Sequence, residues 1–214
     1  ALRERMALLA GLPESVIPEI LAARITETPG GRVLVATMRA AGGHAALVSG
    51  GFTAFTEVVA ARIGFDEHRA NILEIRDGRL TGVVAEPILG REAKVDALEE
   101  ICARLGITPD AAMAVGDGAN DLGMLGRAGA GVALHAKPHV AAQCDIRINH
   151  GDLTALLQSV GHREGAFPLP HGRGDEFHHG SPTPDPRTVP KVPRTRDIGD
   201  PYKHLDEMSD GRGE

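Results

Sequence analysis

The chain has 214 residues, of which 42% are hydrophobic and 3% aromatic, so it is long enough to bury one core built mainly from aliphatic side chains. Its net charge of −6 argues against a surface suited to the phosphate backbone of nucleic acid. No apolar run approaches the ~20 residues that a membrane span needs. We therefore expect an acidic cytoplasmic protein that binds neither nucleic acid nor membranes.

The first 28 residues predict two short helices. The first ends at Gly11, and the second runs over residues 14–23 after Pro13. Because the chain opens at Ala1 rather than Met and directly inside an amphipathic pattern, we expect that a segment precedes it. Helical spacing of apolar residues then predicts a third helix over residues 29–41.

A short apolar run at residues 45–48 predicts a buried strand that ends in a tight turn at Ser49-Gly50-Gly51. Residues 53–63 return to helical spacing. Two β-prone segments follow, and the Asp77-Gly78 pair between them is typical of a hairpin turn. These two strands are expected at residues 70–75 and 79–84.

Strands and helices alternate in the next part of the chain. We expect an amphipathic helix at residues 91–105, strands at 111–115, 131–134 and 145–148, and helices at 122–128 and 153–160. This alternation indicates an α/β fold of the Rossmann-like type, with a mostly parallel sheet and helices on both faces. Cys102 and Cys144 lack the paired spacing of a zinc site or a disulfide framework, so both are expected to be reduced thiols.

The composition changes after Gly161. The remaining residues hold 8 of the 14 prolines and 5 of the 10 histidines, with almost no apolar periodicity. A segment that cannot bury apolar surface does not fold, so residues 161–214 are predicted to be a Pro/His-rich disordered tail. His178-His179 could bind a metal, but solvated histidines are the commoner outcome in such a tail.

In a parallel α/β sheet, ligands bind at the carboxyl ends of the strands. Asp117 and Asp121 follow the strand at 111–115 in the glycine-containing loop Gly116-Asp117-Gly118-Ala119-Asn120-Asp121. Two carboxylates at such a position suit Mg²⁺, which completes its shell with water and substrate phosphate. The alternative is a simple turn in which Asp121 caps the next helix.

Two further features lie at the ends of expected elements. Ser49 and Gly50 precede a helix, where a hydroxyl and unhindered backbone N–H groups can hold an anion, although a plain strand-to-helix turn explains them equally well. Lys94 falls in the first turn of a helix, where the helix dipole disfavours a cation. That placement points to a functional role, and the alternative is a solvated lysine.

Taken in order, these motifs resemble the haloacid dehalogenase-like superfamily and, within it, the phosphoserine phosphatase family. The resemblance covers nearly all of residues 1–160. It rests on residues 1–5, Val48-Ser49-Gly50-Gly51-Phe52, the hairpin at 77–82, Ala93-Lys94, the segment 114–121 and Ala136-Lys137-Pro138. It implies a core over residues 29–160 that lacks its first strand, and a remnant of a small helical cap over residues 1–28.

The resemblance also implies a role for each site residue. Asp117 and Asp121 would form the Mg²⁺ site, and Asn120 would support the metal and phosphate. Ser49 and Gly50 would hold phosphate oxygens, while Lys94 would neutralise charge between phosphate and nucleophile. Arg5 would pair with the carboxylate of phosphoserine, a small phosphorylated metabolite, and its alternative is a solvated helix arginine.

The sequence departs from the family at the nucleophile. Members carry an Asp-x-Asp strand whose first aspartate forms an aspartyl-phosphate and whose second is the general acid and base. Asp-x-Asp occurs nowhere in these 214 residues. We therefore expect a Mg²⁺-dependent phosphomonoester hydrolase of serine biosynthesis whose chain is inactive alone.

Two other functions fit part of the pattern. One is a non-catalytic module that binds a phosphorylated ligand or a partner. The other is the phosphorylation domain of a cation-pumping ATPase, which shares a similar loop, although no membrane span follows here and the helical segment with Arg5 favours a small phosphatase. Oligomeric state is left open.

Overall fold

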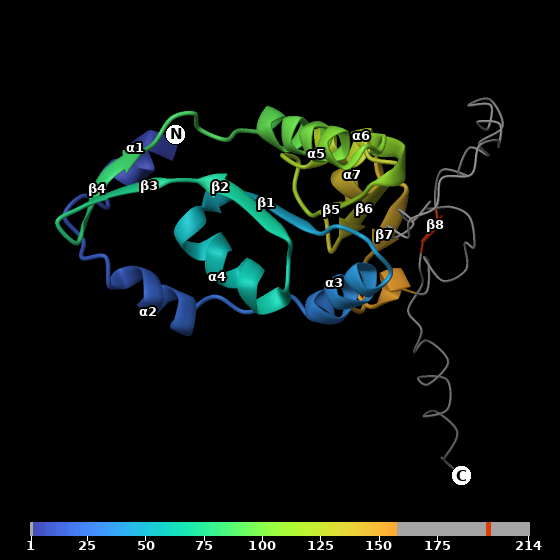
Figure 1. Ribbon diagram of the computed structural model, residues 1–214, viewed down its shortest axis with the longest axis horizontal. Helices are drawn as coiled ribbons and strands as arrows, with labels where there is room; N and C mark the ends of the chain where they lie inside the picture. Colours follow the sequence, from blue (N-terminus) through green and yellow to red (C-terminus); the bar gives the residue numbers. More distant parts are fainter. Residues whose placement is uncertain (1, 158–195, 198–214) are drawn as a thin grey trace, which may run out of the picture.

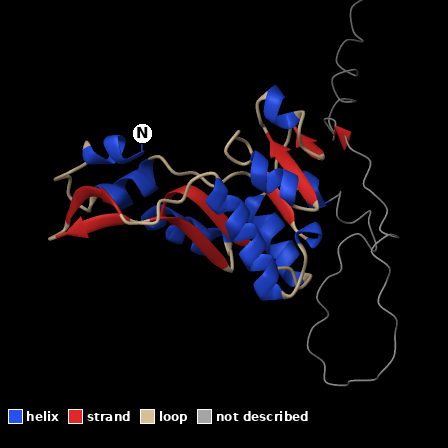
Figure 2. Ribbon diagram, turned by 90° about the horizontal axis from the view of Figure 1, so that it is seen from above, coloured by secondary structure: helices blue, strands red, loops and turns tan. Residues whose placement is uncertain are grey.

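The computed structural model describes residues 2–157 and 196–197. Among these residues, no helix has both the length and the apolar character required to cross a bilayer. The N-terminal helices and a β-hairpin lie at one end, a parallel sheet lies at the other, and a second, smaller sheet lies between them (Figures 1 and 2).

The first of these ends is formed by α1 (Leu2–Ala7), α2 (Val16–Ala23) and the hairpin of β3 (Leu73–Arg76) and β4 (Arg79–Val84). Both predicted helices are present, although the first ends at Ala7 rather than at Gly11 and the second begins at Val16. The Asp77-Gly78 hairpin is confirmed; both turn residues have positive φ, 53° and 70°, as the tight turn requires. Leu80 is buried against the α2 residues Ile17 and Leu21. The hairpin therefore packs with the N-terminal helices.

The smaller sheet is a parallel pair formed by β1 (Ala46–Phe52) and β2 (Glu67–Asn71), which are joined through α4 (Thr53–Ile63). The helix has the predicted bounds. The prediction that the strand ends before Ser49 was wrong, because β1 continues through Ser49-Gly50-Gly51 with a shift in register before Phe52. The predicted strand at residues 70–75 is in fact the end of β2 and most of β3.

The larger sheet contains β5 (Met113–Gly116), β6 (Ala130–Leu134), β7 (Ile146–Ile148) and β8 (Arg196–Asp197), all parallel. Helices cover both faces. On one face, α5 (Glu92–Leu105), α6 (Leu122–Arg127) and α7 (Pro138–Ala141) form a core around Leu125 and Val140. On the other face, α3 (Gly31–Ala40) packs Leu34 against Val132 and Ile148. A single turn of 3₁₀ helix, Pro109–Ala111, precedes β5.

The Rossmann-like α/β architecture with helices on both faces is confirmed, but its parallel strands form two sheets rather than one. Among the described residues, β1 pairs only with β2, and β5 pairs only with β6 and not with β1. Helix α5 contacts β1 and also packs Leu98 into the core beside β5. Helix α5 therefore contacts both sheets, while one edge of β1 and one edge of β5 have no partner strand within the described part of the chain.

The structure describes only part of the elements that were predicted near the C-terminus. Residues 155–157 are helical, and the rest of the helix predicted at 153–160 lies outside the described residues. The predicted tail also lies outside them, apart from the two residues of β8. Cys102 and Cys144 are both free and buried, and burial raises the pKa of each thiol.

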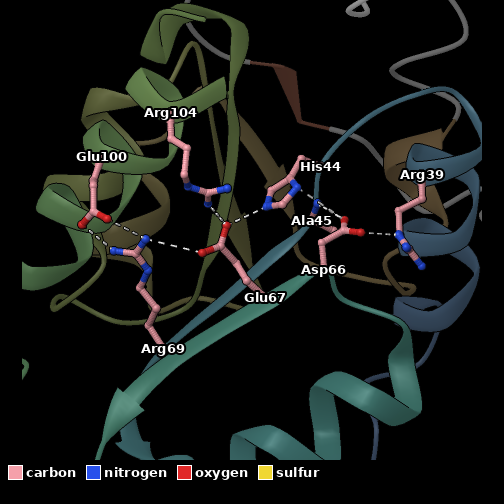
Figure 3. Close-up of polar contacts among 8 residues, drawn as sticks. All are labelled: Arg39, His44, Ala45, Asp66, Glu67, Arg69, Glu100 and Arg104. Atoms are coloured by element: carbon pink, nitrogen blue, oxygen red, sulfur yellow. Dashed lines mark hydrogen bonds and ion pairs between the residues drawn. The ribbon is translucent and has the colours of Figure 1, made fainter. Parts of the chain in front are cut away.

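A network of charges joins the start of β2 to α3 and α5 (Figure 3). Glu67 lies at its centre, where it contacts Arg104, Arg69 and the His44 ring, whose Nε2 is 2.6 Å from Glu67 Oε1. Around it, Arg69 pairs with Glu100 at 2.7 Å, and Asp66 pairs with Arg39 at 2.8 Å. These contacts explain how a strand as polar as Glu67–Asn71 forms.

The same contacts make stability depend on pH. Burial acts to raise the pKa of Glu67, but bonds from His44 and Arg104 and the charge of Arg69 outweigh it, so the pKa lies below the ordinary 4.5. A carboxyl with a lowered pKa in the folded state stabilises above its unfolded pKa, and that contribution is lost as pH falls through the folded value.

We therefore expect Glu67→Gln to lower the free energy of unfolding at neutral pH by about 1 kcal/mol. The loss should shrink as the pH falls below 4.5 and vanish below the lowered pKa of the folded state, where the wild-type carboxyl is neutral as well. Urea titrations over a pH series measure it. Glu99→Gln, in the exposed Arg127–Glu99 pair, is the control. A Glu67→Gln loss that is the same at every pH would contradict this assignment.

Candidate active site

The loop that follows β5 is folded around the carboxylate of Asp121. Its Oδ2 accepts hydrogen bonds from the backbone N–H groups of Asp117 at 3.2 Å and Gly118 at 3.0 Å. Gly116 permits this close approach, because a Cβ there would lie 2.6 Å from that of Asp121. The loop is therefore built to surround one buried side chain.

Lys94 reaches the same carboxylate from the first turn of α5. Its Nζ lies 2.5 Å from Asp121 Oδ1, and the two side chains are only 12% and 4% exposed. The alternative of a solvated lysine is therefore wrong. The alternative of a capping aspartate is also wrong, because Asp121 occupies the N-cap position of α6 without making a side-chain cap bond.

Asp117 and Asn120 differ from Asp121 in being exposed at the end of β5. Asn120 directs its side-chain amide toward Asp121, with Nδ2 3.4 Å from Oδ1. The Asp117 carboxylate has no side-chain partner among the described residues, which leaves its oxygens available to a ligand. Asp121, in contrast, already has Lys94 and two backbone donors as partners.

This difference bears on the predicted magnesium site. A hard cation that keeps several waters needs only one or two carboxylates, so the free Asp117 fits Mg²⁺. No group of three or more His, Cys, Asp or Glu side chains within residues 2–157 is arranged to hold a metal ion. The described residues thus offer one accessible carboxylate at this strand end, that of Asp117, to a cation.

Ser49 and Gly50 lie in the last part of β1, directly before α4. The Ser49 hydroxyl accepts a hydrogen bond from Gly51 N–H at 3.0 Å, and a Cβ on Gly50 would meet nothing within 4 Å. The backbone at Gly50 is thus open to an approaching ligand. Helix α5 contacts β1, and its Lys94 bonds to Asp121 in the loop that follows β5.

Arg5 is separated from these residues. It is exposed on α1, which packs against β4 at the end of the molecule opposite the larger sheet (Figure 1). The structure therefore brings Lys94 together with Asp121 and Asn120, but it does not bring Arg5 to them.

One residue of this region escaped the sequence analysis. Asn71, at the end of β2, is 1% exposed; it donates from Nδ2 to the Gly50 carbonyl at 3.0 Å and accepts from Leu89 N–H at 2.7 Å. A lone asparagine within a β-prone run is an ordinary sequence feature, so no local signal distinguished it.

Comparison with known proteins gives consistent results. The family model described as haloacid dehalogenase-like hydrolase matches residues 1–126. The phosphoserine phosphatase of Polaromonas sp. is 46% identical over 164 residues, which cover 75% of this chain and 70% of that protein. The sequence-based resemblance is thereby confirmed.

Comparison with solved structures also finds phosphoserine phosphatases. A probable phosphoserine phosphatase from Vibrio cholerae superposes with a TM-score of 0.71 at 35% identity over 73% of this chain, which spans 48% of that longer protein. A phosphoserine phosphatase solved as a phospho-aspartyl intermediate analogue gives a TM-score of 0.69 at 37% identity, with 74% and 75% of the two chains covered.

Proposed function

Because this chain belongs to the haloacid dehalogenase-like hydrolase family, we propose that it is the larger part of a phosphatase that hydrolyses O-phospho-L-serine to serine and phosphate. The observation that carries the proposal is the buried Lys94–Asp121 pair. It lies beside the exposed Asp117 and places a cation and a free carboxylate together at the end of a parallel strand.

The chain's own residues would act on the phosphoryl group as follows. The Ser49 hydroxyl and the Gly50 backbone bind phosphate oxygens, and the Lys94 ammonium stabilises negative charge as it develops. Asp121 holds Lys94 at a fixed position through the bond at 2.5 Å. Asn120 supports the same site. Because these donors are fixed in place before reaction, little reorganisation is needed when the substrate reacts.

Mg²⁺ is proposed as the cofactor, and it would supply charge neutralisation at the phosphate. Asp117 would hold it through its free carboxylate. Asp121 would support the site indirectly, since its oxygens already bind Lys94 and two backbone N–H groups.

The nucleophile is proposed to come from a strand that is not among these residues. Attack on phosphorus needs a carboxylate that forms an aspartyl-phosphate, and no Asp-x-Asp occurs in the sequence. The open edges of β1 and β5 offer the hydrogen-bonding groups that one more parallel strand would pair with. A strand between them would end beside Ser49 and Asp117, and without it the chain would be inactive.

The substrate is tested with a panel of small phosphomonoesters. We expect a form that carries an Asp-x-Asp strand ahead of Ala1 to prefer phosphoserine over phosphate esters that lack a carboxylate. Arg5 is proposed to pair with the substrate carboxylate once α1 approaches the site, so Arg5→Ala should raise KM for phosphoserine by roughly tenfold to a hundredfold, because a charged hydrogen bond is lost, and leave a carboxylate-free ester unaffected. An equal change in KM for both esters would show that Arg5 does not bind the carboxylate.

A second candidate function is supported by the missing Asp-x-Asp. A chain that retains the phosphate-binding groups without a nucleophile could bind a phosphorylated ligand and not turn it over. Phosphoserine binding without hydrolysis by the form that carries the added strand would favour this alternative over the phosphatase. A location in the cytoplasm stays a prediction.

A further inference from the structure

Asn71 joins two segments of the candidate site that lie far apart in sequence. Its side-chain amide donates to the carbonyl of Gly50, which together with Ser49 forms the proposed phosphate cradle, and accepts from the N–H of Leu89, in the segment that leads into α5. A carbonyl only accepts and an N–H only donates, so these two partners fix the orientation of the amide. With 1% exposure, Asn71 has no access to a ligand itself.

The backbone around Gly50 needs such a support. The pairing of β1 with β2 is regular from Ala46 to Val48 and then shifts, and the next pair in register is Phe52 with Asn71. The interrupted ladder leaves the residues between Val48 and Phe52 without regular partners on β2. The bond from Asn71 to the Gly50 carbonyl at 3.0 Å anchors this irregular stretch.

The second bond acts on α5. Leu89 lies three residues ahead of Glu92, the first residue of that helix, and five ahead of Lys94. The bond from Leu89 N–H at 2.7 Å fixes the path by which the chain enters the helix. Lys94 in turn bonds to Asp121. A single buried amide therefore links the cradle of Ser49 and Gly50 to the helix that carries the proposed phosphate-binding cation.

We propose that Asn71 is a positioning residue that holds the Ser49–Gly51 backbone and Lys94 at a fixed separation, so that both contact the same phosphate. That this separation serves phosphate binding rests on the proposed function. The link that Asn71 makes between the two segments through its two hydrogen bonds does not. Aspartate would keep the bond from Leu89 but lose the donor to Gly50, and alanine would lose both. No other side chain of similar size donates and accepts in this arrangement.

The test uses the 214-residue chain, inorganic phosphate as the probe, and backbone amide NMR. We expect Asn71→Asp to weaken phosphate binding about tenfold and to shift the amide signals of both Gly50–Gly51 and Leu89–Lys94. Asn71→Ala, which brings no charge into the core, should give at least the same loss. The control is Thr56→Val, which removes another buried polar contact, the one between Thr56 Oγ1 and His68 Nδ1 at 3.0 Å. It should leave phosphate binding within about twofold.

The possible results separate the two proposals. Unchanged phosphate binding in both Asn71 variants, or a loss no larger than that of Thr56→Val at a similar fall in Tm, would overturn the positioning role. If the wild-type chain binds no phosphate, the phosphate cradle of the proposed function fails. The positioning role is then judged by the amide signals alone: it holds if both segments shift in the Asn71 variants, and it falls if either segment does not.

Discussion

Replacing Asp121 by alanine is expected to lower the free energy of unfolding by about 3–5 kcal/mol, because it leaves the ammonium of Lys94 buried without a counter-charge. Lys94 is only 12% exposed, so water cannot fully replace the lost carboxylate. The change also removes the acceptor for the N–H groups of Asp117 and Gly118, on which the shape of the loop depends. Urea denaturation measures the loss.

Two further variants show where that loss comes from. Adding Lys94→Met to Asp121→Ala should recover a large part of the stability, because the buried unpaired charge is removed. Glu99→Ala breaks the Arg127–Glu99 pair, whose side chains are 43% and 50% exposed, and should cost about 1 kcal/mol or less. If Asp121→Ala costs no more than Glu99→Ala, the Lys94–Asp121 pair does not hold the loop.

The sequence predicted elements well wherever the local pattern agreed with the final packing. Helix α4 was predicted with its observed bounds, and the Asp77-Gly78 turn was predicted from the need for two residues of positive φ. The prediction failed at β2, because Glu67–Asn71 is stabilised by partners on α5 and by His44, ahead of β1, which no local window contains. The alternation of apolar and polar residues along a sequence carries no information about partners that lie far away in the chain.

The candidate site likewise depends partly on local sequence and partly on long-range contacts. The order of Ser49, Lys94 and Asp117 along the chain led to the prediction of a phosphate and metal site, which stays a prediction. That order did not distinguish the two aspartates, because Asp117 and Asp121 are alike in sequence and differ only in burial and partners. Asn71 was missed because its importance comes from contacts with Gly50 and Leu89, each 18 or more residues away.

The largest expected effect concerns the nucleophile. These residues supply a cation, a free carboxylate and a proposed phosphate cradle, but no Asp-x-Asp to attack phosphorus. Removing the nucleophile from an enzyme of this covalent type costs many orders of magnitude in kcat. An apolar strand that ends in Asp-x-Asp and pairs with the open edges of β1 and β5 should therefore create activity that the chain alone lacks.

The decisive measurement is Mg²⁺-dependent phosphate release from O-phospho-L-serine by the 214-residue chain and by a form that carries such a strand ahead of Ala1. The account predicts background rates for the chain alone and a rate about 10⁴-fold higher or more for the extended form. That gain should disappear when the first aspartate of the strand or Asp117 is replaced. Ordinary turnover by the chain alone, lost in Asp117→Ala, or a well-folded extended form with no activity, would contradict it.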